Sequence, residues 1–419
     1  MRALLCAYLL LAAGYTGAEP LDNQVHLGVA SCATGVCHGK VAEDGNSNVW
    51  LNEYRIWSAD DRHARAYQTL LTDESKAIAA KLGLPSAQGA KMCLDCHADN
   101  VPQSQRGPKF QISDGIGCEA CHGGAERWIE THTEPDVTHQ ANLAQGMLGT
   151  EDVNVRARVC LSCHLGTAQQ FATHQIMGAG HPRLSFELEA YTLNQPRHYA
   201  VDEDYRQRKG APSGFEVWRA GQVQAAIRYT ELLISPQFPG SDWLPDFAFY
   251  DCHACHHPMD DIRWPVTRRQ TGLVPGLPRL QDQHLQMIRA LASVSSATNA
   301  NQLAQLIDNL VLAGQQGSNA VRGAATALHD FLEAQDWTPA EDLSAATRRA
   351  VALLAANSAM TDYADAEQAF LTLESLSIHI GDAGRLQSHL DAMFNAIESD
   401  QSFNPSQFHQ AAQRLLDAL

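Results

Sequence analysis

One short motif occurs four times in the chain and constrains its fold more than any other feature. It has two cysteines separated by two residues and followed directly by histidine, and it reads CLDCH (93–97), CEACH (118–122), CLSCH (160–164) and CHACH (252–256). Histidine accounts for only 19 of 419 residues, so chance does not explain its fourfold recurrence. Disulfide frameworks and zinc ribbons use paired cysteines, but neither needs a histidine at this position. Attachment of c-type haem does need it.

The spacing within the motif suits that attachment. The two thiols form thioether bonds with the two vinyl groups of one porphyrin, and the next residue binds the iron as its proximal ligand. We therefore predict haem c at four sites, which are formed by Cys93, Cys96 and His97, by Cys118, Cys121 and His122, by Cys160, Cys163 and His164, and by Cys252, Cys255 and His256.

A fifth pair of cysteines is more widely spaced. Cys32 and Cys37 enclose four residues, and His38 follows the second cysteine. The longer loop can still reach both vinyl groups of one porphyrin, and variants of this kind occur among multihaem cytochromes. A disulfide or two free thiols is the alternative. We expect five haem c groups in all, with His38 as the proximal ligand of the first.

The N-terminus has the pattern of an export signal. Arg2 precedes an apolar run from Ala3 to Ala13. Small residues then end at Ala18, where cleavage is expected. The apolar run is too short to span a bilayer, and no later stretch of about 18 apolar residues offers a second candidate. We expect residues 1–18 to be removed and the mature chain to lie in the periplasm without a membrane span; a retained anchor is the alternative.

The cysteines divide the rest of the chain in two. All ten that follow the signal precede residue 256. We expect residues 19–270 to form a multihaem cytochrome c domain with a haem-filled core, short helices and little strand. Residues 271–284, with several prolines and glycines, are expected to be a linker. Residues 285–419 predict an all-α bundle of five or six helices, so the fold class is mostly α.

Signals for helix starts recur in four segments. The expected N-caps are Thr150, Ser213, Thr338 and Asn404, which precede acidic residues, prolines or apolar residues at helical spacing. Glu216 lies three residues after Ser213, so these two predict a capping box.

The net charge of −17 excludes some partners and favours others. An acidic chain has no surplus of cations to neutralise phosphates, so we expect no nucleic-acid partner. A redox partner protein with a basic docking surface suits it better. The sequence has neither the nucleophile elbow of hydrolases nor a dinucleotide-binding fingerprint, and we assign no catalytic residue. It does not predict the oligomeric state.

Two segments resemble the tetrahaem cytochrome c554 family. WSADDRHARAY (57–67) is similar to the family's Trp-x-x-x-x-His-Ala-x-Ala stretch, with one extra residue before His63. GIGCEACHGGAERWIETH (115–132) is similar to the family's third haem site. The order of the four motifs between residues 32 and 164 also agrees, and the resemblance covers roughly residues 28–185.

The resemblance implies distal ligands for two haems. His63 matches the family histidine that binds the third haem, which is here the one on His122. His132 matches the histidine that binds the first haem, which is here the one on His38. It also implies that haems stack in close pairs.

Two further implications concern the second and fourth haems. His181, in GAGHPRLSFEL, corresponds to the histidine that binds the fourth haem, here the one on His164. The family's second haem is five-coordinate, so the haem on His97 is expected to have an open face.

The remaining histidines supply the other candidates. Fourteen of them are left when the five proximal ones are set aside, which favours bis-histidine coordination over methionine. His174 and His257 join His63, His132 and His181 as the distal candidates. Four more histidines before residue 285 are weaker candidates: His139, His198, His253 and His284.

Three functions are open at this point. The first is a periplasmic electron carrier with closely spaced haems. The second is an oxidoreductase that acts on a small nitrogen or sulfur compound at a five-coordinate haem. The third is a scaffold role, in which the C-terminal helices join a larger redox complex.

Overall fold

The computed structural model describes residues 23–42, 49–236, 238, 245–256, 273–274, 277, 279–295, 299–357, 360 and 362–419. Over these ranges the chain forms helices and turns, and extended backbone pairs only at three isolated bridges, which join His26 to Arg106, Tyr250 to Leu280 and Ser295 to Pro339. The predicted mostly-α fold class is confirmed. The expected signal peptide (1–18) and His257 lie outside the described residues.

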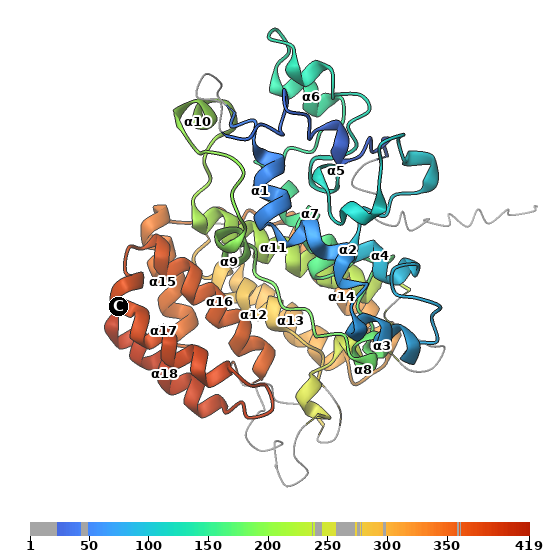
Figure 1. Ribbon diagram of the computed structural model, residues 1–419. Helices are drawn as coiled ribbons and strands as arrows, with labels where there is room; N and C mark the ends of the chain where they lie inside the picture. The colour runs from blue at the N-terminus through green and yellow to red at the C-terminus, as the bar shows by residue number, and fades with distance from the viewer. Residues whose placement is uncertain are drawn as a thin grey trace, which may run out of the picture.

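The first half of the chain is built from short helices joined by turns (Figure 1). These helices are α1 (Glu53–Asp60), α2 (Ala66–Thr69), α3 (Asp73–Lys81), α4 (Lys91–His97), α5 (Cys118–His122), α6 (His139–Ala144), α7 (Val153–His164), α8 (His174–Ala179), α9 (Leu188–Asn194) and α10 (Glu203–Lys209). Several 3-10 turns lie between them.

Longer helices follow. They are α11 (Gly214–Ile234), α12 (Gln283–Ala292), α13 (Ala300–Ala313), α14 (Ser318–Ala334), α15 (Leu343–Ala355), α16 (Tyr363–His379), α17 (Ala383–Ile397) and α18 (Pro405–Ala418). The described part of the chain thus has seven helices from α12 onward, against the expected five or six. None of the described helices has both the length and the apolar character needed to cross a bilayer.

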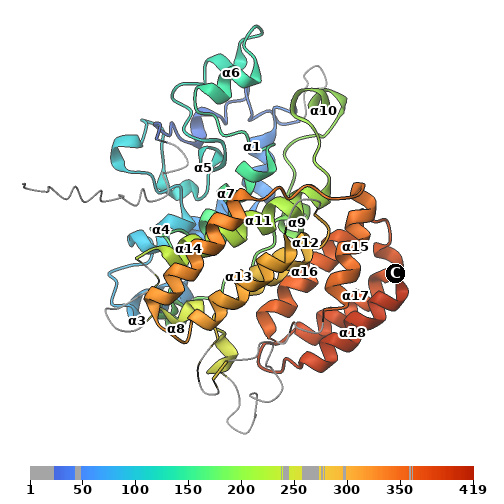
Figure 2. The same cartoon turned by 180° about the vertical axis from the view of Figure 1, so that it is seen from behind.

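Helix α11 is the central element that joins the two parts of the structure. It packs against α12, α14 and α16 on the C-terminal side and against α7 and α9 on the other. Phe215 and Trp218 of α11 are fully buried in an apolar cluster that runs on to Leu415 in α18. In both views α15–α18 lie on one side of α11 and α5 and α6 on the other (Figures 1 and 2).

Two of the four expected helix starts are confirmed. Ser213 precedes α11, and its side chain and that of Glu216 form the predicted capping box. Asn404 precedes α18 and accepts hydrogen bonds from two backbone N–H groups, with Pro405 as the first helical residue. Both starts depend on residues within one turn of the helix, which is why the sequence predicts them.

The other two expected N-caps, Thr150 and Thr338, are wrong. Helix α7 is capped by Asp152 and not by Thr150, because the Asp152 carboxylate accepts from two N–H groups of the first turn. Helix α15 is capped by Asp342 and begins five residues after Thr338. The Thr338 hydroxyl instead donates to the carboxylate of Asp336 at 2.7 Å, so a nearby aspartate displaces the expected cap.

Candidate haem-binding sites

Ten histidines form five pairs of almost equal separation. Each pair joins one histidine of a cysteine motif to one from another part of the chain. The ring centres lie 6.2 Å apart in His38–His132, His63–His164, His122–His198 and His174–His256, and 6.3 Å apart in His97–His181.

This separation fits an iron ion held between two imidazoles. An imidazole nitrogen binds a transition metal at about 2.0–2.1 Å, and the centre of its ring lies about 1.15 Å further away, so two rings on opposite sides of one metal have centres about 6.3–6.5 Å apart. Rings that pack directly can come much closer, as His164 and Phe186 do at 4.4 Å. All five motif histidines therefore have a partner at the distance that a six-coordinate haem requires.

Hydrogen bonds fix the orientation of half of these rings. A histidine that binds a metal through Nε2 commonly donates its Nδ1 proton to a carboxylate or a carbonyl. The Nδ1 contacts are His38 to Glu53 Oε2 at 2.9 Å, His63 to Asp61 Oδ1 at 2.8 Å, His97 to the Ala66 carbonyl at 3.1 Å, His132 to the Ile129 carbonyl at 2.6 Å and His181 to the Pro182 carbonyl at 2.8 Å. Each leaves Nε2 for the iron.

The local fold presents three of the proximal histidines in the same way. Helices α4, α5 and α7 each end at the histidine of their motif. A helix carries the two cysteines and the histidine on its last turn, so the three side chains lie close together. After α5 the chain turns away at Gly123, which has a φ of 79° that glycine adopts without strain.

The wider Cys32–Cys37 motif closes on the same backbone bond as a standard one. The His38 N–H donates to the Cys32 carbonyl at 3.1 Å, and in the last motif the His256 N–H donates to the Cys252 carbonyl at 2.8 Å. The two extra residues bulge outward, and Val36 is 82 % exposed. The longer loop therefore returns its histidine to the position that a haem motif needs.

Glycine is required where this loop closes. A Cβ on Gly39 would lie 2.1 Å from the carbonyl oxygen of Ala33, which is backbone and cannot move aside freely. No heavy atom lies within 4 Å of a Cβ built on Gly35, in the exposed part of the same loop. The close approach at Gly39 keeps the loop tight.

The pairs differ in part from those that the family resemblance implies. His132 does lie opposite His38. His63 lies opposite His164 and not opposite His122. Asp61 caps the 3-10 turn that carries His63 and binds its Nδ1, which fixes the orientation of the ring.

The second and fourth motifs show the other differences. The resemblance implied that His181 lies opposite His164 and that the haem on His97 has an open face. The structure brings His181 to His97 instead, so a histidine ring lies where the resemblance implied an open face. A tight turn after α8, with Gly180 at a φ of 123°, carries His181 to this position.

Two further partners come from segments outside the resemblance or at its edge. His198, which follows α9, lies opposite His122, and His174 at the start of α8 lies opposite His256. His198 was a weak candidate because nothing near it in sequence marks it as a ligand. The other weak candidates have different neighbours: His139 bonds Glu151 at 2.5 Å, and the ring of His253 packs on Tyr363. His284 is buried in the helical part.

Burial favours the neutral form of the deepest rings. It lowers the pKa of His122 to about 4 and, together with the nearby His63, that of His164 to about 4. Burial also lowers the pKa of His97, His132 and His198. A neutral imidazole is the form that binds metal, so the pKa shifts of these five rings agree with the geometry. The hydrogen bonds to Glu53 and Asp61 instead raise the pKa of His38 and His63.

Cysteines of different motifs lie next to each other. The side chains of Cys32 and Cys118 are in contact, and so are those of Cys96 and Cys163. The first motif therefore adjoins the third and the second adjoins the fourth. This arrangement brings the cysteines of two pairs of motifs together.

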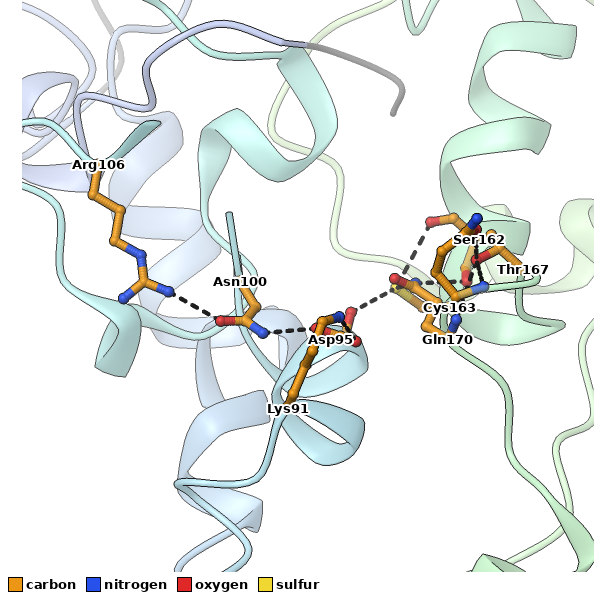
Figure 3. Close-up of polar contacts among 9 residues, drawn as sticks. Lys91, Asp95, Asn100, Arg106, Ser162, Cys163, Thr167 and Gln170 are labelled. Carbon is orange, nitrogen blue, oxygen red and sulfur yellow. Dashed lines mark hydrogen bonds and ion pairs between the residues drawn. The ribbon is translucent and has the colours of Figure 1, made fainter. Parts of the chain in front are cut away.

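A polar network supports the contact between the second and fourth motifs (Figure 3). The sulfur of Cys163 lies 3.8 Å from the carbonyl oxygen of Asp95, and Gln170 Nε2 donates to the same sulfur at 3.3 Å. The Asp95 carboxylate accepts from Asn100 at 2.7 Å, and Asn100 in turn accepts from Arg106 at 3.0 Å. These bonds hold α4 against the end of α7.

Comparison with known proteins agrees with this class of site. Residues 31–123 match the sequence model of a family described as "Cytochrome c554 and c-prime". The match includes the first three motifs and the segment around His63, and it ends before His132. No curated protein and no solved structure matches the chain.

The chain therefore resembles the cytochrome c554 family over this segment. This match supports a c-type cytochrome with covalently bound haem that acts in electron transfer or another haem-dependent activity.

Proposed function

We propose that this protein is a periplasmic electron-transfer cytochrome that holds five haem c groups, each between two histidines. The equal separation of the five histidine pairs, 6.2–6.3 Å between ring centres, is the observation that carries the proposal. The haems would be attached to the cysteines of the five motifs, and His38, His97, His122, His164 and His256 would be the proximal ligands. Their distal ligands would be His132, His181, His198, His63 and His174, in that order.

The protein's own part is to bind, orient and shield these groups. A bound haem supplies one-electron chemistry, and the protein sets its potential and position. Carboxylates and carbonyls on Nδ1 make the imidazoles more basic ligands, which favours ferric iron and a low potential. Two histidines on each iron would leave it no free position for a substrate, which favours electron transfer over catalysis.

Neighbouring motifs support an order for the relay. The contacts Cys32–Cys118 and Cys96–Cys163 support the haem pairs one–three and two–four. Cys121 of the third motif lies within electrostatic range of Cys160 and Cys163 of the fourth, which supports a step between the pairs.

The fifth haem would join the relay at the second. Helix α8 and the turn after it carry both His174 and His181, the distal ligands proposed for the fifth and second haems. A single short segment would thus bind two irons. The relay would run from the first haem through the third, fourth and second to the fifth.

The oxidoreductase alternative needs an iron with a free position. The haem on His97 was the candidate, and the ring of His181 lies opposite it. The structure thus offers no observation that favours this alternative over electron transfer.

Replacing His181 tests the proposal. His181→Ala should convert one haem from low spin to high spin and let it bind carbon monoxide, whereas the unaltered holoprotein should bind none. His139→Ala is the matched control, because His139 bonds Glu151 and faces no motif histidine. A His181→Ala protein with an unchanged low-spin spectrum would contradict the proposed coordination.

Location, partners and domains are part of the same proposal. Cleavage after Ala18 would release the mature chain into the periplasm, and the intact mass of the exported protein tests this. The net charge of −17 suits a basic redox partner, whose binding should weaken as salt is added. We also keep the division into residues 19–270, 271–284 and 285–419 as a prediction, to be tested by limited proteolysis.

A further inference from the structure

Two buried carboxylates stand at the start of α9, between α11 and α16. Glu187 is 1 % exposed and Glu189 is 3 % exposed. Glu187 caps α9: its Oε1 accepts from the Glu189 N–H at 3.1 Å and its Oε2 from the Ala190 N–H at 2.7 Å. The helix cap holds the carboxylate in place although its surroundings are apolar.

Among the residues that the structure describes, the groups that face Glu187 include no cation. Helix α11 presents the neutral amide of Gln222 at 3.5 Å, and α16 presents the hydroxyl of Ser375 at 3.4 Å. The titratable groups nearby are Glu189 on α9 and, through it, His379 on α16. Burial raises the pKa of Glu187 to about 7, and the charge of Glu189 adds to this effect while the two backbone bonds oppose it.

His379 connects the buried carboxylates to solvent. Its Nε2 lies 2.5 Å from Oε1 of Glu189, and its side chain is 30 % exposed. The ring fits because residue 214 is glycine: a Cβ there would lie 1.8 Å from Nε2 of His379. Within the described residues, Oε2 of Glu189 is buried without a hydrogen-bond partner, which leaves an oxygen that can take a proton.

The same segment contacts the fourth haem site. The ring of Phe186 stacks on that of His164 at 4.4 Å, with 23° between the two planes. The backbone of Glu187 is extended, with φ −132° and ψ 126°, so the side chains of Phe186 and Glu187 point to opposite sides. Glu187 thus directly follows Phe186, whose ring contacts the proposed iron ligand His164. The dielectric constant of the protein interior is low, so a charge on Glu187 and a charge at the site of His164 interact more strongly there than in water.

We propose that Glu187, with Glu189 and His379, is a redox-linked proton site for the fourth haem. The Glu187 carboxylate takes one proton from solvent, through His379 and Glu189, when a reduced partner protein delivers one electron to the centre between His63 and His164. Oxidation of that centre returns the proton to solvent. The sum of the charges at this centre and on Glu187 is therefore the same in the oxidised and the reduced protein. This inference rests on the function proposed above.

The test is a spectroelectrochemical titration of the holoprotein at several pH values on either side of pH 7. Electron arrival stabilises the protonated carboxyl, so the reduced protein binds more protons and one of the haem potentials should fall as pH rises. Glu187→Gln should remove this dependence and leave haem content and low-spin absorption unchanged. Glu203→Gln on α10, an exposed glutamate, is the matched control and should behave as wild type.

A second measurement on the wild type guards against a variant that does not fold. Redox-difference infrared spectra should show a carboxylic acid C=O band that appears on reduction and shifts in D₂O. Potentials that do not vary with pH, a dependence that persists in Glu187→Gln, or the absence of that band would overturn the inference. Missing haems or a high-spin wild-type spectrum would instead overturn the proposed function, so the two failures are distinguishable.

Discussion

Glu119 offers the sharpest test of how hydrogen bonds attach the segment around Leu27 and Gly28 to the third haem motif. It lies between Cys118 and Cys121, it is 3 % exposed, and its carboxylate accepts three backbone hydrogen bonds. Oε1 accepts from Leu27 at 2.7 Å and Ala125 at 2.8 Å. Oε2 accepts from Gly28 at 2.7 Å.

Glu119→Gln keeps the shape of the side chain and removes part of its capacity to accept hydrogen bonds. The amide has one oxygen and one NH₂ group, so at least one backbone N–H loses its acceptor. A buried donor without a partner costs about 1–3 kcal/mol, and the remaining bonds weaken because the acceptor is no longer charged. We expect the free energy of unfolding to fall by about 2–4 kcal/mol.

Urea unfolding of the holoprotein, followed by far-UV circular dichroism, measures this loss. Glu126→Gln is the matched control: Glu126 is exposed, seven residues away, and its change should stay within about 0.5 kcal/mol. If Glu119→Gln unfolds at the same urea concentration as the control, the three bonds do not hold the segment and the reasoning is refuted.

Three further predictions concern the haem sites. Gly39→Ala should yield protein with one haem fewer by intact mass, because a Cβ would meet the Ala33 carbonyl, whereas Gly35→Ala should keep all five. His198→Ala should make one haem high spin and open to carbon monoxide; an unchanged spectrum would show that another residue binds there. The rings of His38 and His132 are nearly parallel, at 14°, while three other pairs lie at 85–89°. Electron paramagnetic resonance of the oxidised protein should therefore show one rhombic signal and several large-gmax signals, and a spectrum of rhombic signals alone would contradict these ring angles.

The sequence predicts the features that depend on neighbouring residues. The histidine of each motif directly follows the second cysteine in sequence, so the motif alone predicts a haem site. Likewise, the cap of α11 depends on Ser213 and Glu216, three residues apart. Where a competing side chain lies nearby, as Asp336 does for Thr338, the local signal fails.

The distal partners depend on the whole fold, and the sequence predicts them poorly. His63 lies opposite His164 across about 100 residues of chain, so nothing near it in sequence says which motif it meets. His198 has no local signal at all. The role of α11 also escapes prediction: most of its residues are buried, and its sequence does not say which helices cover them.

The most direct test of the five-haem, bis-histidine assignment is near-infrared magnetic circular dichroism of the oxidised holoprotein, with haem content fixed by intact mass. The five histidine pairs predict a low-spin, bis-histidine band with the intensity of five haems per chain and no high-spin band. A high-spin band, or bis-histidine intensity for four haems or fewer, would contradict it.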